Sequence, residues 1–525
     1  MQRFLTSSAV ALIAGAVPAL AEVTPGQVWT NLASYYSDMG YDIAIGSRDE
    51  AGQNLTLNDV TITTEADYGK TVITVPKINL TQTGDARVRT EFDGDILLTS
   101  EATGEDAEDL PAFDIVISMP GNEMVSSGEP DDMLHEVTYP TLKMALDLGD
   151  EIVTDAEAPF LITVNDVTGT YRAVEDAGRL LTYDFKAAGL DLAVSMNEPE
   201  GEDGQPGEGK ITANAKVDGL SSTGSMTIPE GDFNMAERPD QALEAGMKAD
   251  GTFAMGGIDG TANYSGTNAE GAAESGDVTY TAGKSDLVFS MSGDGLTYEV
   301  GAEGSQMEIA SSDLPFPVGY AIESAKGALT FPISAADAPQ PFTLSYALEG
   351  LTLPDAIWNL FDPQEQLPRD PANLTLDLSG TALVRQSLFD PSFGQQMQDY
   401  AEQMETAEPG TEIAPPPSPF QPKALTINKL SLQAVGVDAQ VTGDLTLPET
   451  EGQMPFGTVE GSFTGVNGLL DKLVSMGLLP QEQVMGARMM IAMFARPAED
   501  NPEQLNTTLE LREDGSIFAN GQQVK

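Results

Sequence analysis

Alternating apolar and polar positions run through most of this 525-residue chain. Segments such as 54–65, 160–174 and 424–446 place Val, Ile, Leu or Thr at nearly every second position. This period is typical of half-buried antiparallel strands with one apolar and one wet face. Gly, Asp, Asn and Ser recur roughly every ten residues, as expected for hairpins and meanders. The pattern predicts a mainly β protein made of extended, curved antiparallel sheets.

A few segments change to the helical period. Residues 25–39, 354–361 and 466–494 predict amphipathic helices, and 237–249 and 391–406 predict weaker ones. A sheet with one apolar face needs something to cover it. We therefore expect the three amphipathic segments to cover or cap the sheets, with an apolar ligand cleft lined by helices as the alternative. The candidate residues for packing or for apolar-ligand binding are Trp29, Trp358, Phe361, Leu469 and Leu473.

Two of these helical segments occur in similar surroundings. The pentapeptide PQEQL at residues 363–367 corresponds to PQEQV at residues 480–484. Each follows an apolar helical segment and precedes a Pro-rich acidic stretch and an alternating strand. This shared order predicts an internal repeat, with an extra helix inserted in the second copy at residues 481–494.

The domain organisation is predicted from the ends and from one Pro-rich stretch. Residues 1–21 have a basic Arg3, an apolar run and an A-x-A cleavage site, which is typical of a cleaved signal peptide; an uncleaved anchor helix is the alternative. A large β-rich region with an N-terminal helix is expected at 22–407, a linker at 408–422, and a C-terminal β region with a helical hairpin at 423–525. We expect a periplasmic or secreted chain with no membrane span after cleavage.

The charge balance restricts the possible partners. The chain has 82 acidic and 25 basic residues, a formal net charge of −57, which opposes nucleic-acid binding. The acidic stretch 197–209 lacks the ligand spacing of a calcium loop. Its two interpretations are a solvated acidic loop and a divalent-cation site. The absence of cysteine excludes thiolate metal sites and thiol nucleophiles, and we expect no cofactor.

Few residues can support the common catalytic arrangements. His135 is the only histidine, which excludes an H-E-x-x-H zinc site, and there is no G-x-S-x-G elbow to accompany it. We expect His135 to be a surface strand residue. The stretch AGKSD at 282–286 ends like a phosphate-binding loop, but Val278 stands where its first glycine belongs. Paired carboxylates for glycoside hydrolysis remain open, although the chain has only two tryptophans for a carbohydrate cleft.

Three C-terminal segments resemble a known family. They read LTINKLSLQAVGVDAQVTGDLTL, GTVEGSFTGVNGLLDKLVSMGLLP and LREDGSIFANGQQ. The chain resembles the bacterial family called domain of unknown function 2125, which is uncharacterised and implies no catalytic residues. The strand pattern is also loosely similar to the AsmA-like envelope proteins. Those are linked to lipid transport and outer-membrane assembly, but this chain differs from them in its cleavable signal.

These observations favour a non-enzymatic envelope protein that contacts an apolar ligand, a lipid or another envelope protein. Many alternating strands and few covering helices leave much one-sided sheet, which needs a ligand or a second sheet. The alternatives are a structural or protein-interaction β protein whose sheets pack on each other without a cleft, and a carboxylate-dependent hydrolase. An open apolar sheet face would favour ligand binding, and a closed sandwich would favour the structural role.

Overall fold

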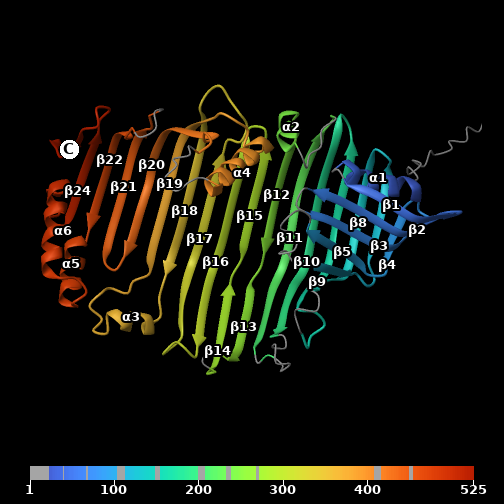
Figure 1. The fold of residues 1–525 in the computed structure, drawn as a ribbon, viewed down its shortest axis with the longest axis horizontal. Coiled ribbons are helices and arrows are strands. Elements are labelled where there is room, and N and C mark those ends of the chain that lie inside the picture. Colours follow the sequence, from blue (N-terminus) through green and yellow to red (C-terminus); the bar gives the residue numbers. More distant parts are fainter. Residues whose placement is uncertain are drawn as a thin grey trace, which may run out of the picture.

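One antiparallel sheet dominates the molecule (Figure 1). The computed structural model describes residues 23–38, 41–66, 69–102, 113–147, 154–198, 207, 209–231, 238–267, 271–406, 415–448 and 453–525. The predicted signal peptide and the acidic residues 199–206 lie outside the described residues. Within these ranges all 26 strands belong to a single sheet, so the mainly β prediction is confirmed.

The strands follow one another along the sheet in nearly sequential order. The first half of the chain contains β1 (Asp42–Ala51), β2 (Asn54–Ala66), β3 (Gly69–Gln82), β4 (Val88–Asp93), β5 (Ile96–Ala102), β6 (Phe113–Ser118), β7 (Glu123–Glu129), β8 (Asp132–Asp147), β9 (Phe160–Glu175), β10 (Gly178–Asn197), β11 (Lys210–Pro229), β12 (Lys248–Met255) and β13 (Ile258–Thr267). The second half contains β14 (Ala273–Ala282), β15 (Ser285–Ser292), β16 (Gly295–Ser311), β17 (Val318–Phe331), β18 (Gln340–Leu351), β19 (Ala372–Val384), β20 (Phe420–Ala434), β21 (Val437–Thr446), β22 (Phe456–Thr464), β23 (Arg496–Pro497), β24 (Gln504–Leu511), β25 (Ile517–Ala519) and β26 (Gln522–Gln523).

The topology is a meander interrupted at three places, the last of which is β24, with which both β23 and β25 pair. β4 and β5 both pair with β3, and β6 and β7 both pair with β8. In the same way β12 and β13 share β11, and β14 and β15 share β16. Short turns join most sequence neighbours, and paired strands place their apolar side chains on the same face of the sheet.

Six helices accompany the sheet in the described ranges. They are α1 (Pro25–Asp38), α2 (Pro239–Glu244), α3 (Asp355–Phe361), α4 (Pro391–Thr406), α5 (Val466–Ser475) and α6 (Gln481–Phe494). The predicted helices at 25–39, 354–361, 391–406 and 466–494 are confirmed, and Pro480 separates α5 from α6. The weak helix predicted at 237–249 is only α2, because β12 already begins at Lys248.

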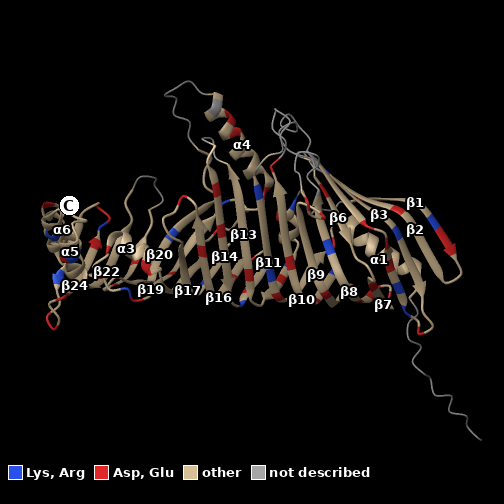
Figure 2. Cartoon of the chain, turned by 90° about the horizontal axis from the view of Figure 1, so that it is seen from below, with Lys and Arg blue, Asp and Glu red and all other residues tan. Residues whose placement is uncertain are grey.

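The N-terminal end of the sheet curls around α1 (Figures 1 and 2). Val28 and Trp29 of α1 share one buried cluster with Leu57 of β2, Val88 of β4 and Met133 of β8. The Thr24 hydroxyl accepts a hydrogen bond from the Gln27 N–H at 3.3 Å, which fixes the start of the helix. This is the largest buried cluster among the described residues, so the main core lies under α1.

The sheet continues across the predicted Pro-rich linker. β19 precedes the linker and β20 begins inside it at Phe420, and the two strands pair from Asn373 opposite Gln433 to Val384 opposite Phe420. The domain boundary at 408–422 stays a prediction, but strands on its two sides are neighbours in one sheet. The helices of the predicted repeat also occupy equivalent places: α3 joins the paired strands β18 and β19, and α5–α6 precedes β24, which pairs with β22.

Candidate functional site

The two faces of the sheet differ in chemistry. In paired antiparallel strands, directly opposite residues point to the same face. One row across β15 to β19 therefore contains Leu287, Val300, Gly327, Tyr346 and Leu376. The adjacent row, on the opposite face, contains Val288, Glu299, Ala328, Ser345 and Asp377. The first face is apolar and the second is mostly polar, as the alternating pattern predicts.

The apolar face is exposed over the middle of the sheet. Six large side chains on it are more than a third exposed: Phe253 (37%), Tyr298 (41%), Val300 (43%), Leu344 (37%), Tyr346 (39%) and Leu432 (43%). The register places all six on one face, from β12 to β20. A contiguous exposed apolar area is typical of an interaction or ligand surface. We call these six residues the open apolar face.

Other parts of the same face are covered by helices. The row that contains His135, Tyr171 and Tyr183 continues strand by strand to Tyr298 and Leu344. At its β8 end this row lies beneath α1, and at its β18 end it is exposed. The apolar surface is therefore continuous from the buried N-terminal core into the open middle.

Two more helices, α2 and α6, cover parts of the apolar face. Leu243 of α2 packs with Met226, Met291, Leu296 and Phe331, which form one row of the apolar face. Near the C-terminal edge, Thr507 of β24 also lies on this face, and its hydroxyl donates to the carbonyl of Phe494 in α6. Helices thus cover both ends of the apolar face, and the six open residues lie between them.

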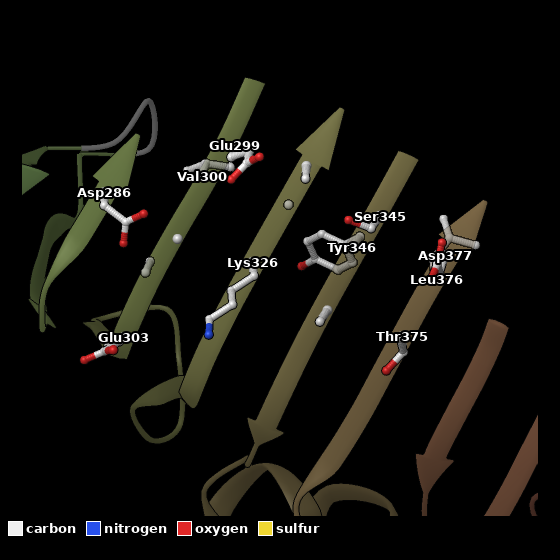
Figure 3. A pocket seen from close by; sticks show the side chains of 15 residues that line it. Asp286, Glu299, Val300, Glu303, Lys326, Ser345, Tyr346, Thr375, Leu376 and Asp377 are labelled. Carbon is white, nitrogen blue, oxygen red and sulfur yellow. The ribbon is translucent and has the colours of Figure 1, made fainter. Parts of the chain in front are cut away.

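Two hollows lie along the sheet. One, of about 430 Å³, contains the paired row Leu192, Ala215, Gly260 and Tyr280, in which two small residues leave space between two large ones. The other, of about 460 Å³, is lined by residues of β15 to β19, including both Glu299 and Val300 (Figure 3). Since consecutive strand residues point to opposite faces, this second hollow reflects a sheet one layer thick rather than an enclosed site.

The five predicted site residues do not form one site. Trp29 is buried in the core beneath α1. Trp358 is buried in α3, with its ring 5.2 Å from that of Phe361 and the Arg369 guanidinium 5.7 Å from its centroid. Phe361 itself is 36% exposed. Leu469 and Leu473 are half-buried in α5. In Figure 1, α1 and α5 lie at opposite ends of the sheet, so these residues belong to separate packing sites.

The prediction for His135 is wrong, because its side chain is fully buried. Its Nδ1 lies 2.7 Å from the Ser126 hydroxyl, and its Nε2 lies 3.2 Å from Oδ1 of Asn31 in α1. With an oxygen acceptor at Asn31, Nε2 carries the proton and Nδ1 accepts from Ser126. The ring also stacks on Tyr171 at 5.5 Å. Burial lowers the pKa of His135 to about 4 and raises the pKa of Tyr171 to about 12.

Ser126, His135 and Asn31 are hydrogen-bonded in the order of a catalytic triad, but a substrate cannot reach the serine. Ser126 and His135 are both fully buried, so the hydroxyl has no room for an acyl substrate. The arrangement instead ties α1 to the sheet. A second tie is made by Arg179 of β10, which donates to the Ser34 hydroxyl of α1 at 2.8 Å.

The residues of the open apolar face were missed in the sequence, although the signal was present. Tyr298 and Val300 alternate with Thr297 and Glu299, which is the ordinary pattern of a half-buried strand. Alternation identifies the apolar face but not whether something covers it. His135 was missed for a related reason: it shares parity with Met133 and Val137, which are both buried.

The described residues offer little for metal binding or membrane spanning. No group of three or more His, Asp or Glu side chains in these ranges is arranged to hold a metal ion. Among the same residues, no helix has the length and apolar character needed to cross a membrane.

The comparisons with known proteins identify a family but no function. No curated protein and no solved structure matches the chain. One family of uncharacterized proteins conserved in bacteria matches over residues 261–521, from β13 to the C-terminal hairpin. This range includes five of the six residues of the open apolar face, all but Phe253, and it includes α3 to α6. Residues 261–521 of this chain are therefore similar to the uncharacterised bacterial family DUF2125.

Proposed function

We propose that this protein is a non-enzymatic, exported envelope protein that binds the hydrocarbon chains of lipids on the open apolar face. The observation that carries the proposal is a group of exposed large apolar side chains in neighbouring rows on one side of a single-layer sheet. Each CH₂ group of a lipid that leaves water contributes about 0.8 kcal/mol. A hydrocarbon chain lying across several strands would gain enough free energy to bind without any polar anchor.

The architecture supports a ligand better than a closed structural sandwich. The described strands form one sheet, and no second sheet covers Tyr298, Val300 or Tyr346. The outer face carries charged and hydroxyl side chains such as Glu299 and Asp377, which suits contact with water. The predicted signal peptide at residues 1–21 supports the periplasmic location that the proposal assumes.

A matched pair of valines tests the proposal. Val300 (43% exposed) and Val288 (36% exposed) lie on neighbouring strands but on opposite faces. We expect Val300→Asp to weaken the binding of a fluorescent fatty acid at least about tenfold. The new aspartate carboxylate would have to lose water beside the hydrocarbon chain of the ligand. Val288→Asp should bind as the wild type does. The readout is a fluorescence titration of each purified protein.

The outcomes separate the candidate functions. Equal weakening by both variants would mean that charge, not the apolar face, controls binding. A wild-type protein that takes up no fatty acid and carries no lipid in native mass spectrometry would contradict the proposal. The apolar face would then be a docking surface for another protein, which is the structural alternative.

A further inference from the structure

The outer side of α6 is apolar and strongly exposed. Met485 (57%), Met489 (74%), Met490 (62%) and Met493 (50%) lie on it, and Met485, Met489 and Met493 are spaced four residues apart along one stripe. At the turn between the helices, Leu478 is 46% exposed. We call these five residues the hairpin patch.

The inner side of α6 is apolar as well. Val484 is buried, and Ile491 and Phe494 are half-buried. The Phe494 carbonyl accepts hydrogen bonds from the Thr507 hydroxyl and, at 2.9 Å, from the Asn520 amide, which fixes the end of the helix on the sheet. From Met489 to Phe494 every residue of the helix is apolar, and a helix that is apolar on all sides is normally buried. Packing within the described residues therefore does not explain why the patch is apolar.

The hairpin is a fixed unit rather than a loose arm. Arg488 of α6 is ion-paired with Asp471 of α5 at 2.6 Å. The Ser475 hydroxyl at the end of α5 donates to the Gln366 side chain at 2.6 Å, which ties the hairpin to the segment after α3. The patch is thus presented in one orientation, at the end of the molecule opposite α1 (Figure 1).

The charge of this segment differs from that of the whole chain. Residues 466–497 contain three basic residues, Lys472, Arg488 and Arg496, and two acidic ones, Asp471 and Glu482. The segment has a net charge of +1 in a chain of −57. Basic residues beside exposed apolar side chains are typical of helices that lie in the interface of a bilayer.

We propose that the hairpin patch docks this protein on the surface of a lipid bilayer. The methionines and Leu478 enter the boundary between headgroups and acyl chains, while the exposed Arg496 after the end of α6 meets the phosphates. The contact uses different residues from the open apolar face, so it does not depend on the ligand binding proposed above. It places the C-terminal end of that face next to a source of lipid.

The structure disfavours the other occupants. Val23, the first described residue, packs in the cluster beneath α1, at the end of the sheet opposite α6 (Figure 1). A second copy would bring a second net charge of −57 close to the first. The repulsion between the two copies opposes their association at low salt. A bilayer of zwitterionic lipid carries no such net charge.

Flotation with vesicles of phosphatidylcholine and phosphatidylethanolamine tests the docking. We expect the wild-type protein to float with the vesicles and the double variant Met489→Ser/Met490→Ser to do so at least about tenfold less. The matched control is Met397→Ser/Met404→Ser on α4, where the two methionines are 43% and 51% exposed. This control should float as the wild type does.

Each outcome has one meaning for the docking proposal. A wild-type protein that stays with the protein fraction, or a hairpin variant that floats normally, overturns it. A dimer in analytical ultracentrifugation that the hairpin variant abolishes, without vesicle binding, would show that a second copy occupies the patch. Fatty-acid titration of the same variants keeps the two proposals apart, because the hairpin variant should bind fatty acid normally.

Discussion

Truncation of Leu57 to alanine is expected to lower the free energy of unfolding around α1 by about 2–5 kcal/mol. Leu57 is fully buried and belongs to the cluster that contains Val28 and Trp29. Removing most of its side chain leaves a cavity between α1 and β2, which the rigid sheet cannot close. The same substitution at Leu344, on the same type of face but 37% exposed, should cost less than about 1 kcal/mol.

The two tryptophans provide local probes for this comparison. Trp29 lies in the cluster of Leu57, and Trp358 lies in α3, which directly follows the strand of Leu344. Urea unfolding of Leu57→Ala is followed by Trp29 fluorescence in a Trp358→Phe background, and that of Leu344→Ala by Trp358 in a Trp29→Phe background. If Leu344→Ala costs as much as Leu57→Ala, the middle of the face is covered in solution and the proposed lipid surface does not exist.

The sequence predicts the elements of this fold well because each depends on local periodicity. The alternating positions of residues 160–174 become β9, and the 3.6-residue period of residues 25–39 becomes α1. Pro480 ends one helical segment and allows the next to begin, as its missing N–H requires. Short turns make sequential neighbours pair, so the meander also follows from local features.

Which parts of the sheet are covered by helices could not be predicted in the same way. Residues such as Tyr298 and Leu344 show the same alternation as Leu57, yet two are exposed and one is fully buried. The difference depends on which helix lies above each strand, and that is a contact between segments far apart in the chain. Alternation therefore predicts an apolar face but cannot decide between a sandwich and an open surface.

The residues predicted for packing or for an apolar ligand do not include the open apolar face, and the reason is physical. Trp29 and Trp358 are the largest apolar side chains, and large side chains are most useful in packing. Both are buried, so neither is available to a ligand. The open face instead uses Phe, Tyr, Val and Leu at ordinary strand positions, where alternation marks the apolar face but not that it is uncovered.

The buried histidine predicts that docking of α1 depends on pH. Burial lowers the pKa of His135 from 6.5 to about 4 in the folded protein. The unfolded chain therefore binds a proton at higher pH than the folded chain does. Stability is complete above about pH 6.5 and falls as the pH decreases towards 4, by about 3 kcal/mol in total. The lost stability concerns the contact between α1 and the sheet, because Nε2 of His135 is hydrogen-bonded to Asn31 of α1.

Substitution of His135 by glutamine isolates this effect from the other titrations. Glutamine can accept from Ser126 and donate to Asn31, but it does not titrate. Carboxylates such as Asp132, whose pKa is lowered by its hydrogen bonds from Arg172, change with pH equally in both proteins. We therefore expect the difference in urea midpoint between wild type and His135→Gln, followed by Trp29 fluorescence, to shift in favour of the variant between pH 7 and pH 4.5. A constant difference over that range would mean that His135 is not held neutral beneath α1, and that the helix is fixed by the apolar cluster of Val28 and Trp29 alone.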